Sequence, residues 1–233
     1  MPDDGRVALV SGASRGIGAA IGRDLLGRGW RLSLGLRDGR LPDWADPARC
    51  MACGYDATDP AAPEAWVAQT LARLGRIDAV VASAGILVPG SVIELDDEGL
   101  DAMWEVNVKG PRRLVRAAWE PLKATGAGRV IVLASLSGKR IKSPGSGGYG
   151  LTKFAAVALT HGIRQAGHAF GIRATAICPS YVATDMTAHV GSVPAAEMTR
   201  PEEVATLVGT LLGLPNEAVV AELCINYTLE PSV

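Results

Sequence analysis

The sequence is poor in aromatic side chains and in net charge. Aromatic residues make up 5% of the 233 residues, and 23 Lys and Arg stand against 24 Asp and Glu, for a formal net charge of -1. Proteins that bind nucleic acid or anionic lipid normally carry excess positive charge, and those that stack on bases carry exposed rings. We therefore expect neither nucleic acid nor a membrane among the partners.

Long apolar runs are also missing. No run approaches the roughly 18 residues that a membrane-spanning helix needs. The start, Met1-Pro2-Asp3-Asp4-Gly5, lacks the basic flank and the longer apolar stretch of a secretory signal. These features predict a cytoplasmic protein.

Cysteine and histidine are scarce. Without an export signal, the four cysteines are expected to be reduced, buried thiols. Cys50-Met51-Ala52-Cys53 has the spacing of a redox or zinc half-site, but it supplies only two of the four ligands of a structural zinc site. The three histidines show no metal-ligand spacing, so we predict no metal.

Short apolar runs alternate with helical patterns along the whole chain. Seven candidate strands lie at residues 7–10, 32–36, 50–55, 77–82, 130–134, 173–178 and 223–227. Several of these runs are continuously apolar, which is typical of strands covered by helices on both faces. Strand-helix alternation implies parallel pairing. The pattern predicts a Rossmann-like, doubly wound parallel α/β sheet of about seven strands in a single domain over residues 1–233.

Helical patterns also fit residues 98–124, 149–170 and 201–212. Pro111 is expected to kink or divide the first of these, because proline has no N–H to donate within a helix. The last begins with Pro201 followed by Glu202 and Glu203, which suit the positive end of a helix.

Glycine is in excess, at 28 of 233 residues against roughly 7% in average proteins. The first strand runs into Ser11-Gly12-Ala13-Ser14-Arg15-Gly16-Ile17-Gly18, where the first helix begins. Glycines let the backbone turn tightly and bring amide N–H groups close to a diphosphate at a helix N-terminus. The spacing is GxxxGxG and not the GxGxxG of the usual dinucleotide motif, so a purely structural turn is the alternative.

The end of the second strand suggests which nucleotide binds. An acidic residue about 20 positions beyond the turn would hold the ribose 2'-hydroxyl of NAD, but Leu36 stands there and Arg37 follows. Arg15 in the glycine turn adds a second guanidinium, a group well matched to phosphate. NADP(H) is therefore favoured, although Asp38 could restore some NAD(H) binding and both arginines could be ordinary solvated residues.

Tyr149-Gly150-Leu151-Thr152-Lys153 places a phenol and an ammonium four residues apart, on one face of a helix. A free tyrosine has a pKa of about 10, and a fixed neighbouring cation would lower that pKa toward neutrality. A tyrosine with such a pKa can exchange protons with a substrate. The same spacing also occurs in ordinary half-buried surface pairs.

Together, these motifs resemble the short-chain dehydrogenase/reductase family, over nearly the whole chain. The turn matches the family's TGxxxGxG with Ser11 for Thr, and Tyr149 and Lys153 match its YxxxK. Further matches are Asp56 in a D-V-T-D-like segment, Ala84-Gly85 after the fourth strand, the helix residue Asn107, Ser135 at the end of the fifth strand, and Pro179, Val182 and Thr184 in a P-G-x-x-x-T-like segment. Ser137 is the alternative to Ser135. The interval from Ser135 to Tyr149 is one residue longer than the family's usual interval, and the interval from Ser137 is one residue shorter.

The resemblance implies a role for each matching residue. Tyr149 would protonate the substrate carbonyl oxygen, Ser135 would hydrogen-bond that oxygen, and Lys153 would bind the nicotinamide ribose and depress the tyrosine pKa. Asn107 would hold a water that relays protons to Lys153. Asp56 would hold the adenine, and the Val182 backbone and the Thr184 hydroxyl would anchor the carboxamide.

The resemblance further implies an NADP(H)-dependent oxidoreductase acting on a small carbonyl or secondary alcohol, assembled as a homotetramer or homodimer through the helices around Asn107 and Tyr149. The alternatives are a non-catalytic nucleotide sensor and an epimerase or dehydratase. The sequence departs from the family at Ser180, which replaces a glycine, in the stretch from Arg37 to Cys50, which is too short for a full crossover helix, and after Asn226, where V-D-G-G is absent.

Overall fold

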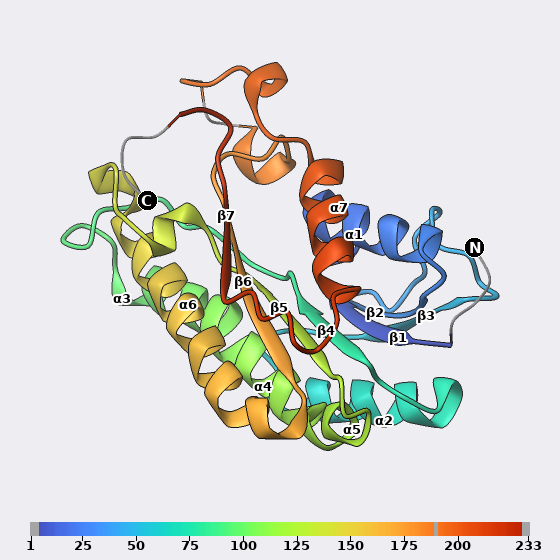
Figure 1. Cartoon of the computed structure of the whole chain (residues 1–233). Coiled ribbons are helices and arrows are strands. Elements are labelled where there is room, and N and C mark those ends of the chain that lie inside the picture. The colour runs from blue at the N-terminus through green and yellow to red at the C-terminus, as the bar shows by residue number, and fades with distance from the viewer. Residues whose placement is uncertain (1–4, 189–190, 230–233) are drawn as a thin grey trace.

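The computed structural model describes residues 5–188 and 191–229, so the predicted range 1–233 extends beyond the described residues at both ends. Seven parallel strands form one sheet in the order β3-β2-β1-β4-β5-β6-β7, as Figure 1 shows. The strands are β1 (Val7–Ser11), β2 (Arg31–Leu36), β3 (Cys50–Gly54), β4 (Ala79–Ala82), β5 (Arg129–Leu133), β6 (Arg173–Pro179) and β7 (Glu222–Ile225). The predicted doubly wound sheet is confirmed.

Helices cover both faces of the sheet (Figure 1). One face packs on α1 (Gly16–Gly27) and α7 (Pro201–Leu212), and the other on α2 (Ala62–Leu74), α4 (Gly110–Ala117), α5 (Trp119–Ala124) and α6 (Gly147–Gly167). Successive side chains of a strand point to opposite faces, so Leu9 joins one core and Val10 the other. This is why the strands have continuous apolar sequences.

The predicted helix 98–124 is divided, as expected, at two places: a π-helical turn just before Pro111 and a turn at Ala118. It consists of α3 (Asp97–Trp104), a π-helical turn (Glu105–Lys109), α4 and α5. Pro111 cannot donate the α-helical hydrogen bond to the Asn107 carbonyl, and the Gly110 N–H bonds to the Glu105 carbonyl instead. The proline therefore perturbs the turn that precedes it, which is the turn that carries Asn107.

The connection from β2 to β3 is short, as its sequence indicated. Residues 37–49, all of them described, form turns and contain no helix. Trp44 packs there against α1, where a Cβ on Gly22 would lie 2.4 Å from the tryptophan ring. One indole thus occupies space beside α1 that a crossover helix would otherwise cover.

Among the described residues, no helix is both long and apolar enough to cross a membrane. Because all strands are parallel, the loops that follow β1, β2, β4, β5 and β6 meet at one edge of the sheet. This carboxyl edge brings the predicted site residues together.

Candidate functional site

The glycine turn between β1 and α1 packs directly on the loop after β4. Gly12 has φ +67°, and a Cβ on it would lie 2.9 Å from the Ala84 backbone. The Ser11 hydroxyl accepts hydrogen bonds from the N–H groups of Ser83 (3.1 Å) and Ala84 (3.2 Å). A Cβ on Gly18 would lie 2.3 Å from the Gly12 carbonyl oxygen, so the turn closes only with glycine at these positions.

The N-terminus of α1 carries no capping group of its own. Arg15 at the N-cap makes no side-chain cap, and the first turn holds no acidic residue. The first N–H groups of a helix need acceptors, and the helix dipole favours an anion among them. The turn Gly12-Ala13-Ser14-Arg15-Gly16-Ile17-Gly18 therefore has the chemistry to hold a phosphate group.

Arg37 and Asp56 meet at the ends of β2 and β3. Asp56 Oδ1 accepts from the Thr58 N–H (2.8 Å) and hydroxyl (2.7 Å). These bonds, with a smaller contribution from the Arg37 charge, lower the pKa of Asp56. Arg37 is exposed and Leu36 is buried. The side chain that faces solvent at this edge is therefore a cation, and the Leu36 position offers no acid.

Arg15 points away from this pair. Its Nη1 lies 2.7 Å from Asp185 Oδ2, just after Thr184, and both side chains are more than 70% exposed. The structure therefore pairs Arg15 with an acid on the far side of the glycine turn. Its predicted contribution beside Arg37 stays a prediction.

The phenol of Tyr149, the ammonium of Lys153 and the hydroxyl of Ser135 lie close together. Tyr149 and Lys153 are both buried on α6, with Lys153 Nζ 5.5 Å from the centre of the tyrosine ring. The Ser135 hydroxyl lies near enough to the Tyr149 phenol to lower its pKa. Ser137 contributes its N–H to Ser135 Oγ (3.0 Å), so of the two candidate serines the structure brings Ser135 to the phenol.

Gly138, which follows these serines, was not among the predicted site residues. A Cβ on it would lie 2.5 Å from the Lys153 carbonyl oxygen, so its lack of a side chain lets the loop after β5 reach α6. Its position three residues after Ser135 is the only sequence signal that could have indicated this contact.

Burial dominates the electrostatics of this group. It raises the pKa of Tyr149 well above its usual value, although the nearby Ser135 hydroxyl opposes the rise. It lowers the pKa of Lys153 to about 8, and Lys153 Nζ donates to the Leu133 carbonyl (2.8 Å). The groups of the chain alone therefore do not produce the lowered tyrosine pKa that we expected, because desolvation is the largest influence on the phenol.

The side chain of Asn107 links the loop after β4 to α6. It is 2% exposed, its Oδ1 accepts from the Ile86 N–H (2.9 Å), and its Nδ2 donates to the Ile86 carbonyl (2.9 Å) and to Thr152 Oγ1 (3.0 Å). The side-chain amide is thus committed to the protein, which leaves its main-chain carbonyl as the group suited to hold a water. Thr152, inside the YxxxK motif, is a supporting residue that our sequence reading missed.

The segment after β6 faces the glycine turn. A Cβ on Gly16 would lie 3.4 Å from the Thr184 methyl group, and the Thr184 N–H donates to Thr187 Oγ1 (3.2 Å). Val182 is buried, and its carbonyl accepts from Thr187 Oγ1 (2.6 Å). Pro179 begins this segment, and its carbonyl lies 3.4 Å from Ser135 Oγ. The predicted carboxamide residues are therefore close to both the turn and the catalytic group.

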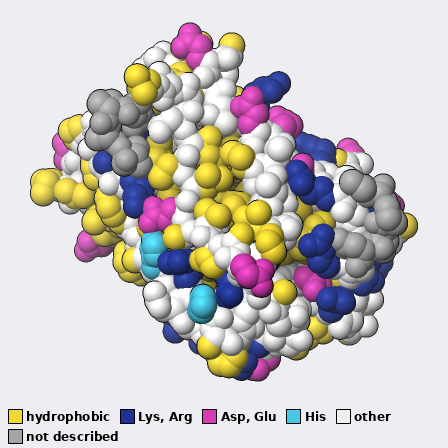
Figure 2. Space-filling model, in the orientation of Figure 1, with side chains coloured by type: hydrophobic (Ala, Val, Ile, Leu, Met, Phe, Trp, Pro, Cys, Tyr) yellow, Lys and Arg dark blue, Asp and Glu magenta, His cyan; other side chains and the backbone are white. Residues whose placement is uncertain are grey.

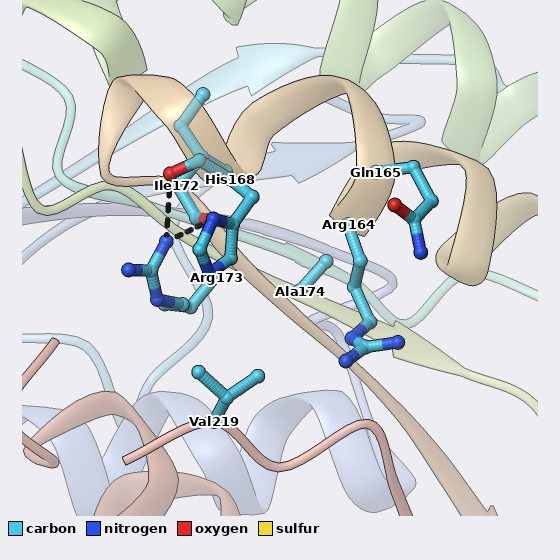
Figure 3. A pocket seen from close by; sticks show the side chains of 7 residues that line it. All are labelled: Arg164, Gln165, His168, Ile172, Arg173, Ala174 and Val219. Atoms are coloured by element: carbon cyan, nitrogen blue, oxygen red, sulfur yellow. Dashed lines mark hydrogen bonds between the residues drawn. The ribbon is translucent and has the colours of Figure 1, made fainter. Parts of the chain in front are cut away.

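Two small cavities elsewhere contain none of the predicted site residues. One, of about 50 Å³, lies between the end of α6 and the start of β6. Figure 3 shows Arg173 there, with its guanidinium bound to the carbonyls of His168 and Ile172. The second, of about 290 Å³, contains Arg6, Trp30 and Arg129 near the start of β1. Both lie at the opposite, amino edge of the sheet.

Replacing Lys153 by methionine should stabilise the protein, because a buried charge is removed. The difference between pKa values of 10.5 and about 8 corresponds to about 3 kcal/mol, and part of it is offset by loss of the bond to Leu133. We expect a gain of about 1 to 3 kcal/mol in the free energy of unfolding at pH 7 from denaturant titration.

The gain should shrink between pH 8 and 10.5. In that range the unfolded wild type binds more protons than the folded one, so wild-type stability rises with pH while that of the variant does not. The exposed Lys142→Met variant is the control and should change stability little. A destabilised Lys153→Met protein would contradict this account of the site.

Comparison with known proteins agrees with this geometry. A family model described as short chain dehydrogenase matches residues 6–194. The chain is 35% identical over 223 residues to an agropine synthesis reductase of Rhizobium rhizogenes, covering 92% of this chain and 50% of that protein. It is 33% identical over 204 residues to the oxidoreductase UcpA of Escherichia coli, covering 85% and 76% respectively.

Solved structures show the same fold. An alcohol dehydrogenase from Thermococcus sibiricus, complexed with 5-hydroxy-NADP, superposes with a TM-score of 0.85 at 33% identity and covers 94% of this chain and 95% of its own. A short chain dehydrogenase from Burkholderia cenocepacia in complex with NADP gives 0.86 at 27% identity, with 97% and 98% covered. The chain spans about half the length of the agropine synthesis reductases it matches. The extent of the family match and the arrangement at the carboxyl edge together show that this chain belongs to the short-chain dehydrogenase/reductase family.

Proposed function

We propose that this chain is an NADP(H)-dependent oxidoreductase that transfers hydride between the nicotinamide and a small carbonyl or secondary alcohol substrate. The observation that carries the proposal is the buried Tyr149 phenol, which has the Ser135 hydroxyl beside it and Lys153 Nζ 5.5 Å from its ring centre, at the carboxyl edge of the sheet. The bound cofactor supplies the hydride. The residues of the chain bind it, orient the substrate and move the proton.

The cofactor residues fall into two groups in this proposal. The turn from Gly12 to Gly18 receives the diphosphate, with Arg37 at the 2'-phosphate and Asp56 at the adenine. Lys153 binds the nicotinamide ribose, and Val182 and Thr184 hold the carboxamide. Ala84 and Gly85 lie beside the nicotinamide end of the cofactor in this proposal, and a Cβ on Gly85 would make a tight contact of 3.3 Å with Asn107 Oδ1 and an ordinary contact of 3.6 Å with Lys153 Nζ.

The proton chemistry follows from burial. Because burial raises its pKa, Tyr149 is protonated near pH 7 and can donate to a carbonyl oxygen as the alkoxide develops. Ser135 hydrogen-bonds the same oxygen. Lys153, with a pKa of about 8, carries positive charge near neutrality and stabilises the phenolate left behind. The Asn107 carbonyl would hold the water through which Lys153 exchanges protons with solvent.

NADP(H) is favoured over NAD(H) by the cation at the end of β2. The similar structures from Thermococcus sibiricus and Burkholderia cenocepacia, which are complexes with 5-hydroxy-NADP and NADP, support the binding of NADP(H). Asp38, next to Arg37, is the residue that would instead permit some use of NAD(H). We further propose that residues 1–233 act as one cofactor-binding domain.

Tyr149→Phe should abolish reduction but not cofactor binding. Loss of a positioned general acid typically costs 10²–10⁴-fold in rate. We expect NADPH consumption with a panel of ketones to fall by about that factor, with the Kd for NADPH, from fluorescence titration, unchanged within about twofold. Tyr55→Phe removes a buried phenol that lies against Trp66 and is the matched control.

Three outcomes would count against the assignment. Full turnover in Tyr149→Phe would exclude Tyr149 as the acid. NADPH binding by the wild type without turnover on any ketone would indicate a sensor. Interconversion of a substrate without net consumption of NADPH would indicate an epimerase.

Arg37→Leu should weaken NADPH binding selectively. A charge-assisted hydrogen bond contributes about 1.5–3 kcal/mol, so the Kd for NADPH should rise roughly 10- to 100-fold while that for NADH changes little. Arg40→Leu, an exposed arginine of the same connection, is the control. Equal losses for both cofactors would show that Arg37 does not read the 2'-phosphate.

We also propose that the chain assembles as a homodimer or homotetramer through the α3 and α6 surface. Trp104, Leu151 and Phe154 are each about 40% exposed or more on these helices, next to Tyr149 and Lys153. Large apolar side chains on neighbouring helices favour burial against a second copy. Light scattering coupled to size exclusion should give a mass of two or four chains of 24.2 kDa, and a monomer at micromolar concentration would exclude the assembly.

A further inference from the structure

A group of metal-binding side chains that the proposed chemistry does not use lies directly behind Ser135. Cys178 on β6 and Cys224 on β7 are paired in register on neighbouring parallel strands. Their sulfur atoms and a carboxylate oxygen of Glu222 all lie within 4.8 Å of one another. Cys178 is buried, whereas Cys224 is exposed, contrary to our expectation that all four thiols are buried.

The pair that the sequence suggested cannot form such a site. Cys50 and Cys53 are both buried, but Cys50 joins the core on one face of the sheet and Cys53 the core on the other. Their spacing of three along a strand sends the two side chains to opposite faces. A single ion therefore cannot bind both. Cys178 and Cys224, which are 46 positions apart, meet only through the pairing of β6 with β7.

The carboxylate of the group is already oriented. Glu222 Oε2 lies 2.7 Å from Lys139 Nζ, and Oε1 lies 2.7 Å from His161 Nε2. Figure 2 shows acidic, basic and histidine side chains gathered next to hydrophobic ones on the face that carries β7 and α6. Outer partners of this kind hold the carboxylate ligands of metal sites in position.

We propose that Cys178, Cys224 and Glu222 bind a thiophilic divalent cation of the Zn²⁺ class, with solvent in the fourth position. Zinc takes thiolate sulfur at about 2.3 Å and carboxylate oxygen at about 2.0–2.2 Å, so neighbouring ligand atoms of a tetrahedral site lie roughly 3.5–4 Å apart. The three atoms need to move together by about 1 Å at most. This coordination is three protein ligands and one open position.

The charge of the ligands favours a cation among them. Two thiolates and one carboxylate carry three negative charges, which exceed the single positive charge of the Lys139 ammonium that pairs with Glu222. Each thiol gives up one proton and nothing is oxidised or reduced. A cysteine thiol with its usual pKa of about 8.5 is protonated near pH 7, so the ion displaces two protons on binding.

Cadmium is a suitable probe, because cadmium bound to thiolates absorbs in the ultraviolet by charge transfer. Titration of the fully reduced protein with Cd²⁺ should saturate at one equivalent and release two protons, measured with a pH indicator in weak buffer. Cys224→Ser and Glu222→Gln should each raise the Kd about tenfold or more. Cys53→Ser is the matched control and should leave both the band and the Kd unchanged.

Several results would overturn the site. One is the absence of a charge-transfer band from wild-type protein whose four thiols have all been shown, with a thiol reagent, to be reduced. The others are an unchanged Kd in Cys224→Ser and loss of the band in Cys53→Ser. The titration uses neither cofactor nor substrate, so its outcome is independent of the proposed reductase function.

Occupation of the site should also affect Ser135. The Cys178 sulfur lies near the Ser135 backbone, and the next carbonyl, that of Pro179, lies 3.4 Å from Ser135 Oγ. We expect one equivalent of Zn²⁺ to slow ketone reduction by the wild type and not by Cys224→Ser. Binding of the ion with unchanged turnover would exclude this coupling while retaining the site.

Discussion

The burial of Tyr149 and Lys153, one turn apart on α6, is the constraint around which the carboxyl edge is built. Taking a phenol and an ammonium out of water costs free energy, which is why the lysine pKa falls to about 8 and the tyrosine pKa rises. The Leu133 carbonyl, which accepts a hydrogen bond from Lys153 Nζ (2.8 Å), offsets part of this cost.

Close backbone contacts position this buried pair. Gly138 lets the loop after β5 touch α6, and Gly12 lets the first turn touch the loop after β4. Asn107 then joins that loop to Thr152, beside Lys153. The glycine turn, the loop after β4 and the buried Tyr149–Lys153 pair are therefore parts of one connected framework.

Particular residues illustrate what the patterns in the sequence could and could not predict. Pro111 predicted a divided helix, but only the structure shows that one of the two divisions falls on the turn carrying Asn107. Spacing left Ser135 and Ser137 as alternatives, and the closeness of the Ser135 hydroxyl to the Tyr149 phenol distinguishes them. The two arginines looked like partners, yet Arg15 pairs with Asp185, which lies 170 positions away. Side-chain partners at that separation leave no periodic signal in one sequence.

The sequence by itself determined the parallel sheet, its helical layers and the motifs at its edge, because apolar periodicity and glycine spacing act locally along the chain. Only the tertiary structure determines which charged groups and which thiols are buried and which of them lie next to each other. Desolvation reverses the pKa shift expected for Tyr149, and strand pairing brings Cys178 to Cys224 while it separates Cys50 from Cys53. Burial and register depend on every element of the fold at once, so no local pattern can encode them.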